Sequence, residues 1–217
     1  MSDRPGRTSR RIMLLAGVGV LAAGAGLVSA RYLRSPPATP QIAGFLWPGP
    51  RPLGDFSLDA ADGSPLDQSH LEGHWSFLFF GYTHCPDVCP TTLSVMHQVM
   101  TQLRGSDAAE DVQVVFVSVD PQRDTPDRLG EYTRYFDREF LAASAADERL
   151  QRFTRKLGVL YRAGEADAQG NYEVDHTASI LLVDPRGRLV GIFSAPHEPG
   201  DIARRFGRMR EHVEASA

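Results

Sequence analysis

Two cysteines carry the most evident chemistry in this chain, because Cys85 and Cys89 are its only cysteines and lie four positions apart. Three interpretations compete. A structural disulfide is the simplest, but a bridge that closes so short a loop removes little entropy from the unfolded chain. A redox-active pair is the second, since a helix N-terminus lowers the pKa of a cysteine and so makes the reactive thiolate more abundant. A metal site is the third.

A histidine later in the chain favours the third interpretation. Oxidoreductases that use a cysteine pair at a helix start typically have the spacing Cys-x-x-Cys, whereas three residues intervene here. They also carry a cis-proline opposite the pair, but the corresponding stretch, residues 174–177, contains His176 and no proline. Two thiolates and one imidazole suit Cu(I), and the imidazole allows Cu(II). Structural zinc sites usually take a fourth ligand. Copper is the better fit, although the spacing alone is compatible with all three interpretations.

Three aspartates and one further histidine adjoin these candidates. Asp87 lies between the cysteines, Asp175 adjoins the late histidine, and Asp120 follows a predicted strand. Each could accept a hydrogen bond near the site and so tune a ligand, although aspartate is also common in turns. His84 directly precedes the first cysteine. We expect its side chain to point away from a metal there, because adjacent positions of an extended chain face opposite sides.

The surrounding sequence predicts alternating strands and helices. Residues 75–82 form a continuous apolar run, typical of a strand buried on both faces, that leads into the cysteine loop. Apolar residues at helical spacing follow as far as Leu103. Similar patterns predict the other elements, which are a hairpin at 55–66, strands at 112–119, 177–183 and 189–193, and helices at 127–136, 147–157 and 199–213, with an irregular stretch at 137–146. This order predicts an α/β fold, a thioredoxin-like central mixed sheet with helices on both faces.

An apolar run near the N-terminus predicts a membrane anchor. Residues 12–30 carry no charge, follow four arginines and precede two. A helix of this length reaches roughly 28 Å, close to the hydrocarbon thickness of a bilayer. The arginines orient the N-terminus toward the cytoplasm. We therefore expect a single-pass transmembrane helix in the bacterial inner membrane, with the rest of the chain in the periplasm. The alternative is a cleaved signal peptide and a soluble periplasmic protein, because Val28-Ser29-Ala30 resembles a cleavage site and Arg10-Arg11 a twin-arginine signal.

The chain is thus expected to have three regions. Residues 1–34 are the anchor or signal segment, 35–52 are a linker with six prolines, and 53–217 are the thioredoxin-like domain. The net charge is −4, and the first 34 residues contain six arginines against one acid, so the remainder is more acidic than the net charge implies. This acidity argues against nucleic acid as a partner.

Three separated blocks of sequence resemble the Sco/SenC family of copper chaperones. They are the run from Phe80 to Leu93 that contains both cysteines, the block from Val117 to Pro126, and the block from Tyr172 to His176. The resemblance extends over residues 55–195. It implies that Cys85, Cys89 and His176 bind Cu(I) or Cu(II), and that the protein helps to assemble the CuA centre of cytochrome c oxidase subunit II.

We therefore expect a metallochaperone rather than an enzyme. Such a protein receives copper from a donor protein and passes it to cytochrome c oxidase subunit II or another cuproprotein. It also depends on a thiol reductant, because a disulfide between Cys85 and Cys89 would block metal binding. The alternative is a thiol–disulfide oxidoreductase that acts on the cysteines of an oxidase subunit and uses the same two residues as a redox disulfide.

Overall fold

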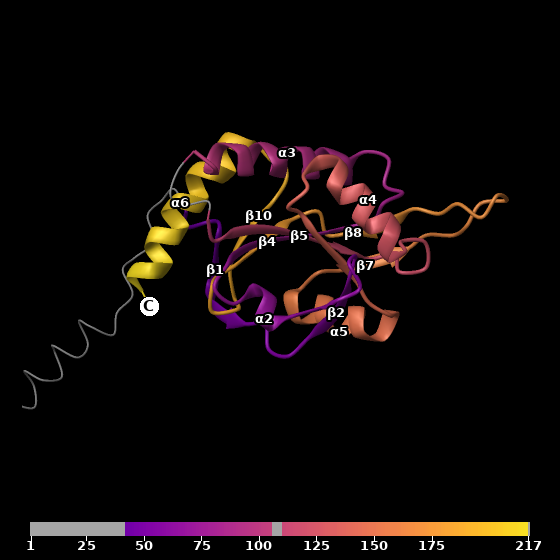
Figure 1. Ribbon diagram of the computed structural model, residues 1–217, viewed down its shortest axis with the longest axis horizontal. Coiled ribbons are helices and arrows are strands. Elements are labelled where there is room, and N and C mark those ends of the chain that lie inside the picture. Colours follow the sequence, from indigo (N-terminus) through magenta and orange to yellow (C-terminus); the bar gives the residue numbers. More distant parts are fainter. Residues whose placement is uncertain (1–41, 106–109, 217) are drawn as a thin grey trace, which may run out of the picture. The chain divides into compact units, whose positions relative to one another are not determined.

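The computed structural model of the 217-residue chain describes residues 42–105 and 110–216 (Figure 1). Within these ranges, the residues up to Glu211 belong to one compact unit, which the following description concerns. The predicted membrane segment at residues 12–30 lies outside the described residues. Within the described ranges, no helix combines the length and the apolar composition that a membrane span requires.

Strands and helices alternate along most of the described chain. The strands are β1 (Leu46–Pro52), β2 (Ser57–Ala60), β3 (Pro65–Asp67), β4 (Trp75–Gly81), β5 (Val112–Ser118), β6 (Leu141–Ser144), β7 (Tyr161–Ala163), β8 (Val174–His176), β9 (Ile180–Val183) and β10 (Arg188–Phe193). The helices are α2 (Gln68–Leu71), α3 (Val88–Leu103), α4 (Pro126–Phe136), α5 (Asp147–Leu157) and α6 (Pro199–Ala215).

Strands β4 and β5 lie at the centre of an eight-stranded sheet with the order β1-β10-β9-β4-β5-β6-β2-β3. Every residue of β4 is buried, as its continuous apolar run predicts. Strand β4 is parallel to β5 and antiparallel to β9, so that Phe79 lies opposite both Phe116 and Ile180. The loops that follow β4 and β5 therefore leave the sheet at the same end, because the carboxyl ends of parallel strands lie side by side. The candidate site lies at this end of the two central strands.

Helices cover both faces of the sheet (Figure 1). On one face, Phe77 of β4 contacts Phe206 of α6 with ring centroids 5.2 Å apart. On the other face, Phe80 of β4 contacts Phe153 of α5 at 6.1 Å, because successive strand residues point to opposite sides. Figure 1 shows α3 and α4 above the sheet, and α2 and α5 below it. The predicted mixed sheet with helices on both faces is confirmed.

Four strands lie where the sequence predicts none, and two of them, β7 and β8, have only three residues each. Strand β1 occupies residues 46–52 of the predicted linker and pairs with β10 at the edge of the sheet. An edge strand tolerates prolines, because one side of it needs no partner. Strand β6 lies in the predicted irregular stretch at 137–146 and pairs with both β5 and β2. Its short sequence, LAAS, has no alternating pattern, so its conformation depends on its neighbours.

Candidate metal centre

The two cysteines lie where β4 passes into α3. Strand β4 ends at Gly81, and the backbone N–H of Cys85 donates to the carbonyl of Tyr82 at 3.2 Å, which folds the intervening loop tightly. Cys85 is partly exposed in this loop, whereas Cys89 lies in the first turn of α3 and is fully buried. Both are free thiols.

Gly81 allows the helix to approach the sheet this closely. A Cβ atom on Gly81 would lie 2.7 Å from the Sγ of Cys89 and 2.9 Å from the ring of Phe116. Real Cβ atoms essentially never approach other heavy atoms so closely. The absence of a side chain at the end of β4 is therefore what leaves space for the buried sulfur.

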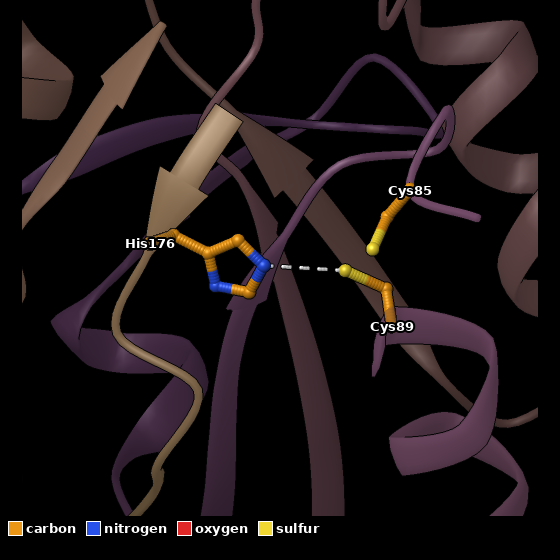
Figure 2. Close-up of side chains that lie close together, drawn as sticks. All are labelled: Cys85, Cys89 and His176. Atoms are coloured by element: carbon orange, nitrogen blue, oxygen red, sulfur yellow. Dashed lines mark hydrogen bonds between the residues drawn. The ribbon is translucent and has the colours of Figure 1, made fainter. Parts of the chain in front are cut away.

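His176 is the last residue of β8 and faces the cysteines (Figure 2). Its ring lies edge-on to the rings of Phe79 and Tyr82, with centroids 6.2 Å and 6.0 Å away. Its Nδ1 lies 3.2 Å from the carbonyl oxygen of Thr177. A proton on Nδ1 donates to this oxygen, which leaves the lone pair on Nε2. The Nε2 atom lies 3.4 Å from the Sγ of Cys89.

The three candidate ligands converge. The sulfurs of Cys85 and Cys89 and a ring nitrogen of His176 all lie within 4.8 Å of one another, and Figure 2 shows both sulfurs directed toward the imidazole ring. Metal bonds of roughly 2.0–2.3 Å to nitrogen and sulfur hold such atoms about 4 Å apart. Small side-chain rotations are therefore enough for one ion to contact all three.

Burial shifts the proton equilibria of two of these groups. Burial raises the pKa of the Cys89 thiol, an effect that a backbone hydrogen bond from Tyr82 partly opposes. Burial lowers the pKa of His176, although the carbonyl of Thr177 and the charge of Asp175 oppose the shift. At neutral pH the metal-free site therefore contains a protonated Cys89 and a neutral imidazole. A metal that binds there must displace the thiol proton but finds a nitrogen lone pair already available.

A buried aspartate holds the loop that precedes Cys85. The carboxylate of Asp124 accepts hydrogen bonds from the backbone N–H of Thr83 at 2.9 Å and from the hydroxyls of Thr83 and Ser118, each at 2.6 Å. His84 also turns toward this carboxylate, with Nδ1 3.6 Å from an oxygen of Asp124. The ring of His84 is thus associated with Asp124, as expected for a residue that points away from the cysteine site.

The three aspartates considered near the site differ in their surroundings. Asp87 is exposed and accepts a hydrogen bond from the hydroxyl of Thr91 at 3.3 Å, which is turn chemistry. Asp175 is largely exposed and pairs with Arg162 at 3.5 Å. Asp120 is buried and contacts Tyr172 and Arg123. Among the hydrogen bonds of the described residues, none joins these carboxylates directly to the cysteines or to His176.

A shallow hollow leads from the surface to the candidate ligands. It has a volume of about 260 Å³, and Cys85 and His176 line it together with Tyr82, Val88 and Glu173. The hollow gives an incoming molecule access to Cys85, while Cys89 stays buried behind it.

Several residues of the site were not identified as functional from the sequence. Gly81, Tyr82 and Asp124 had no distinguishing spacing, because their roles depend on contacts between separate elements. The three blocks that stood out by resemblance do contain these residues, since 80–93 includes Gly81 and Tyr82, 117–126 includes Asp124, and 172–176 includes Tyr172. That resemblance marked the segments without revealing that they meet.

Comparison with known proteins gives concordant results. A model of the SCO1/SenC family matches residues 49–211. A protein of Stutzerimonas stutzeri that is named for copper binding is 37% identical over 152 residues, which are 70% of this chain and 74% of that protein. The bovine mitochondrial SCO2 homolog is 34% identical over 162 residues, which are 75% of this chain but 60% of that protein.

A solved structure has the same fold. The structure of Bradyrhizobium japonicum ScoI with copper bound is 34% identical in sequence and superposes with a TM-score of 0.65. The match covers 72% of this chain and 98% of that chain. The thioredoxin-like α/β architecture predicted from the order of elements is therefore shared with a protein that holds copper.

Proposed function

Because the chain belongs to the SCO1/SenC family, we propose that it is a copper metallochaperone in which Cys85, Cys89 and His176 bind the metal. The observation that carries this proposal is the convergence of two sulfurs and one imidazole nitrogen within 4.8 Å. This soft donor set suits copper. The copper named for the Stutzerimonas and Bradyrhizobium relatives supports the same choice of metal.

Each ligand has a different part in metal capture. Cys85 is partly exposed at the hollow and meets the incoming ion first. Cys89 then gives up its proton as its sulfur binds, because only the thiolate is a good ligand. His176 completes the shell through Nε2, whose lone pair is already directed at the sulfurs.

A shell of three ligands also favours release. It leaves a coordination position open toward the hollow, where a ligand of a recipient protein can bind before a ligand of this chain departs. Copper then passes by ligand exchange and is never free in solution. We infer that the recipient is the CuA site of cytochrome c oxidase subunit II or another cuproprotein. A copper donor protein and a thiol reductant that keeps both cysteines reduced complete the cycle.

We further propose that the protein works at the periplasmic face of the inner membrane, held there by residues 12–30. The uncharged run and its flanking arginines support this location. Alkaline extraction of membranes and protease treatment of spheroplasts test it. The domain should stay with the membrane and be degraded from the periplasmic side. Release of the domain with the soluble periplasmic fraction would indicate cleavage instead.

Copper titration of the reduced protein without oxygen tests the proposed ligands. Wild type should bind one Cu(I) per chain in competition with a chromogenic chelator. Cys85→Ser, Cys89→Ser and His176→Ala should each weaken binding by more than about 100-fold, since even residues that only support a metal ligand cost 10- to 100-fold. His84→Ala is the matched control and should bind like wild type, because His84 lies against Asp124. Unchanged affinity in all three ligand variants would refute the proposal.

A thiol–disulfide oxidoreductase is the second candidate function. The pairing of a partly exposed Cys85 with a buried Cys89 four residues later supports it, since such enzymes attack with one thiol and resolve with the other. In this reaction the two thiols become a disulfide and pass two electrons and two protons to the disulfide of the target. A reduction assay on His176→Ala separates the functions. Full reductase activity without copper binding would favour the enzyme.

A further inference from the structure

We propose that Tyr172, Arg123 and Asp120 form a latch that positions His176 against the cysteines and thereby slows copper release. This inference rests on the proposed function. The latch joins two separate parts of the fold, the loop after β5 and the segment that leads into β8. No residue of the latch is among the three proposed copper ligands.

The hydrogen bonds of Asp120 tie these two parts together. Asp120 is 3% exposed and lies directly after Val119, in the loop that follows the central strand β5. Its carboxylate accepts a hydrogen bond from the hydroxyl of Tyr172 at 2.7 Å and another from Nε of Arg123. Tyr172 lies four positions before His176. The hydroxyl of Tyr172 thus attaches the segment that carries the histidine to the rigid centre of the sheet.

Arg123 extends this contact toward the metal ligands. Its guanidinium carbon lies 3.6 Å from the ring centroid of Tyr172 and 5.7 Å from that of Tyr82. The ring of Tyr82 in turn meets His176 edge-on, and the hydroxyl oxygen of Tyr82 accepts a hydrogen bond from the backbone N–H of Val174. The planar guanidinium therefore lies between two aromatic rings, one before His176 in the chain and one beside it in space.

His176 needs such support because its own strand is small. Strand β8 has three residues, and among the strands of residues 42–105 and 110–216 it pairs only with the three residues of β7, in a two-stranded sheet separate from the main one. A two-stranded ribbon is only marginally stable in isolation. Exposed residues 165–171 connect the strands on one side. The position of His176 relative to Cys89 therefore depends on contacts outside the ribbon, and the latch supplies them on the side that precedes the histidine.

A weaker latch should lower the apparent copper affinity and accelerate copper release. If the latch is weakened, the ribbon spends more time displaced from the cysteines, and the apparent affinity falls in proportion to the fraction that is correctly placed. A hydrogen bond to a charged group is among the stronger ones in proteins. We expect its loss in Tyr172→Phe to accelerate Cu(I) release to a chelator about tenfold. The aromatic ring, and with it most of the packing, stays in place.

A double-mutant cycle tests the latch. The Cu(I) release rate is measured for wild type, Tyr172→Phe, His176→Ala and the double variant, with Tyr135→Phe as a control that removes the hydroxyl of a tyrosine 85% exposed. Tyr172→Phe should release copper about tenfold faster than wild type, and Tyr135→Phe should not. In the His176→Ala background, Tyr172→Phe should have almost no further effect, because the latch acts only through the histidine. An equal effect in both backgrounds, or none in either, would overturn the inference.

Two further measurements separate positioning from general destabilisation. Arg123→Lys keeps the positive charge but loses the planar contact with both rings, and it should also accelerate release severalfold. In the Cu(II) form, the nitrogen hyperfine signal of His176 should weaken in both latch variants while the melting temperature of the metal-free protein changes little. An unchanged signal in both would overturn the inference. Failure of wild type to bind copper would instead refute the proposed function. In that case, faster hydrogen exchange in β8 of metal-free Tyr172→Phe would still support the tether between Tyr172 and Asp120, and unchanged exchange would overturn it.

Discussion

The Nε2 atom of His176 lies 3.4 Å from the Sγ atom of Cys89, although the two residues are 87 positions apart in the chain. The order of strands in the sheet explains this proximity. Strand β4 leads into the helix that carries Cys89, and β9 begins four residues after His176. Because β4 and β9 are antiparallel neighbours, with Phe79 opposite Ile180, the end of one strand lies beside the start of the other. The sheet therefore brings the sulfur and the imidazole together.

Copper affinity should rise with pH. Burial raises the pKa of Cys89, so this thiol is protonated in the metal-free protein at neutral pH and loses its proton when copper binds. Each proton released makes the affinity change about tenfold per pH unit. We expect at least a tenfold decrease in the dissociation constant per unit between pH 6.5 and 8, measured by chelator competition. A dissociation constant independent of pH over this range would contradict the expectation.

The pH dependence should come from sulfur and not from the imidazole. Burial lowers the pKa of His176 below its ordinary value, so the neutral imidazole predominates in this pH range. His176→Ala should therefore bind copper more weakly but with the same slope against pH. In Cys89→Ser, the affinity should change about tenfold less per pH unit than in wild type, because one proton fewer is released on binding. Proton release measured with an indicator dye during copper addition provides an independent check.

Much of the fold, but not all of the site, could be predicted from the sequence. The buried run at 75–82 and the helical periodicity at 147–157 predicted β4 and α5 well, because their patterns reflect their own packing. Strands β1, β6, β7 and β8 were missed, since β1 contains prolines and the other three have only three or four residues each. The positions of Gly81 and Asp124 in the site could not be predicted, because each depends on a contact between elements far apart in sequence.

Gly81→Ala should displace the sulfur of Cys89 and destabilise the fold. The added Cβ would lie 2.7 Å from the Sγ of Cys89, and such overpacking costs about 1–3 kcal/mol. We expect a lower free energy of unfolding in urea and weaker Cu(I) binding, because the sulfur must move. Gly207→Ala in α6 is the matched control, since nothing lies within 4 Å of its added Cβ. That change should be neutral or stabilise the helix by up to about 1 kcal/mol. Equal effects of the two substitutions would argue against the close approach.

Asp124→Ala should strongly destabilise the metal-free protein. It leaves the backbone N–H of Thr83 and two hydroxyls without their buried acceptor. A buried group left without a hydrogen-bond partner costs about 1–3 kcal/mol. We expect the free energy of unfolding, measured in urea, to fall by about 2–4 kcal/mol. Asp62→Ala is the control. Asp62 also accepts from a backbone N–H and a hydroxyl, both of Ser64, but at an exposed turn, so its loss should cost less than about 1 kcal/mol. A small effect at Asp124 would show that the loop before Cys85 is held by other contacts.

Copper should stabilise the folded chain. A ligand that binds only the folded state contributes about 4 kcal/mol when its free concentration is 1,000 times the dissociation constant. For a domain of this size, we expect a rise of roughly 8–16 °C in the melting temperature under buffered Cu(I). At the same free copper concentration, His176→Ala should show a much smaller rise. Equal stabilisation of both proteins would mean that the histidine does not bind the metal.

X-ray absorption at the copper edge tests the central claim most directly. For the wild-type protein loaded with one Cu(I) under anaerobic conditions, we predict two sulfur neighbours and one nitrogen neighbour at roughly 2.0–2.3 Å. Cys85→Ser and Cys89→Ser should each lose one sulfur, and His176→Ala should lose the imidazole scattering. A wild-type spectrum with two sulfurs but no imidazole, unchanged in His176→Ala, would contradict the three-ligand site.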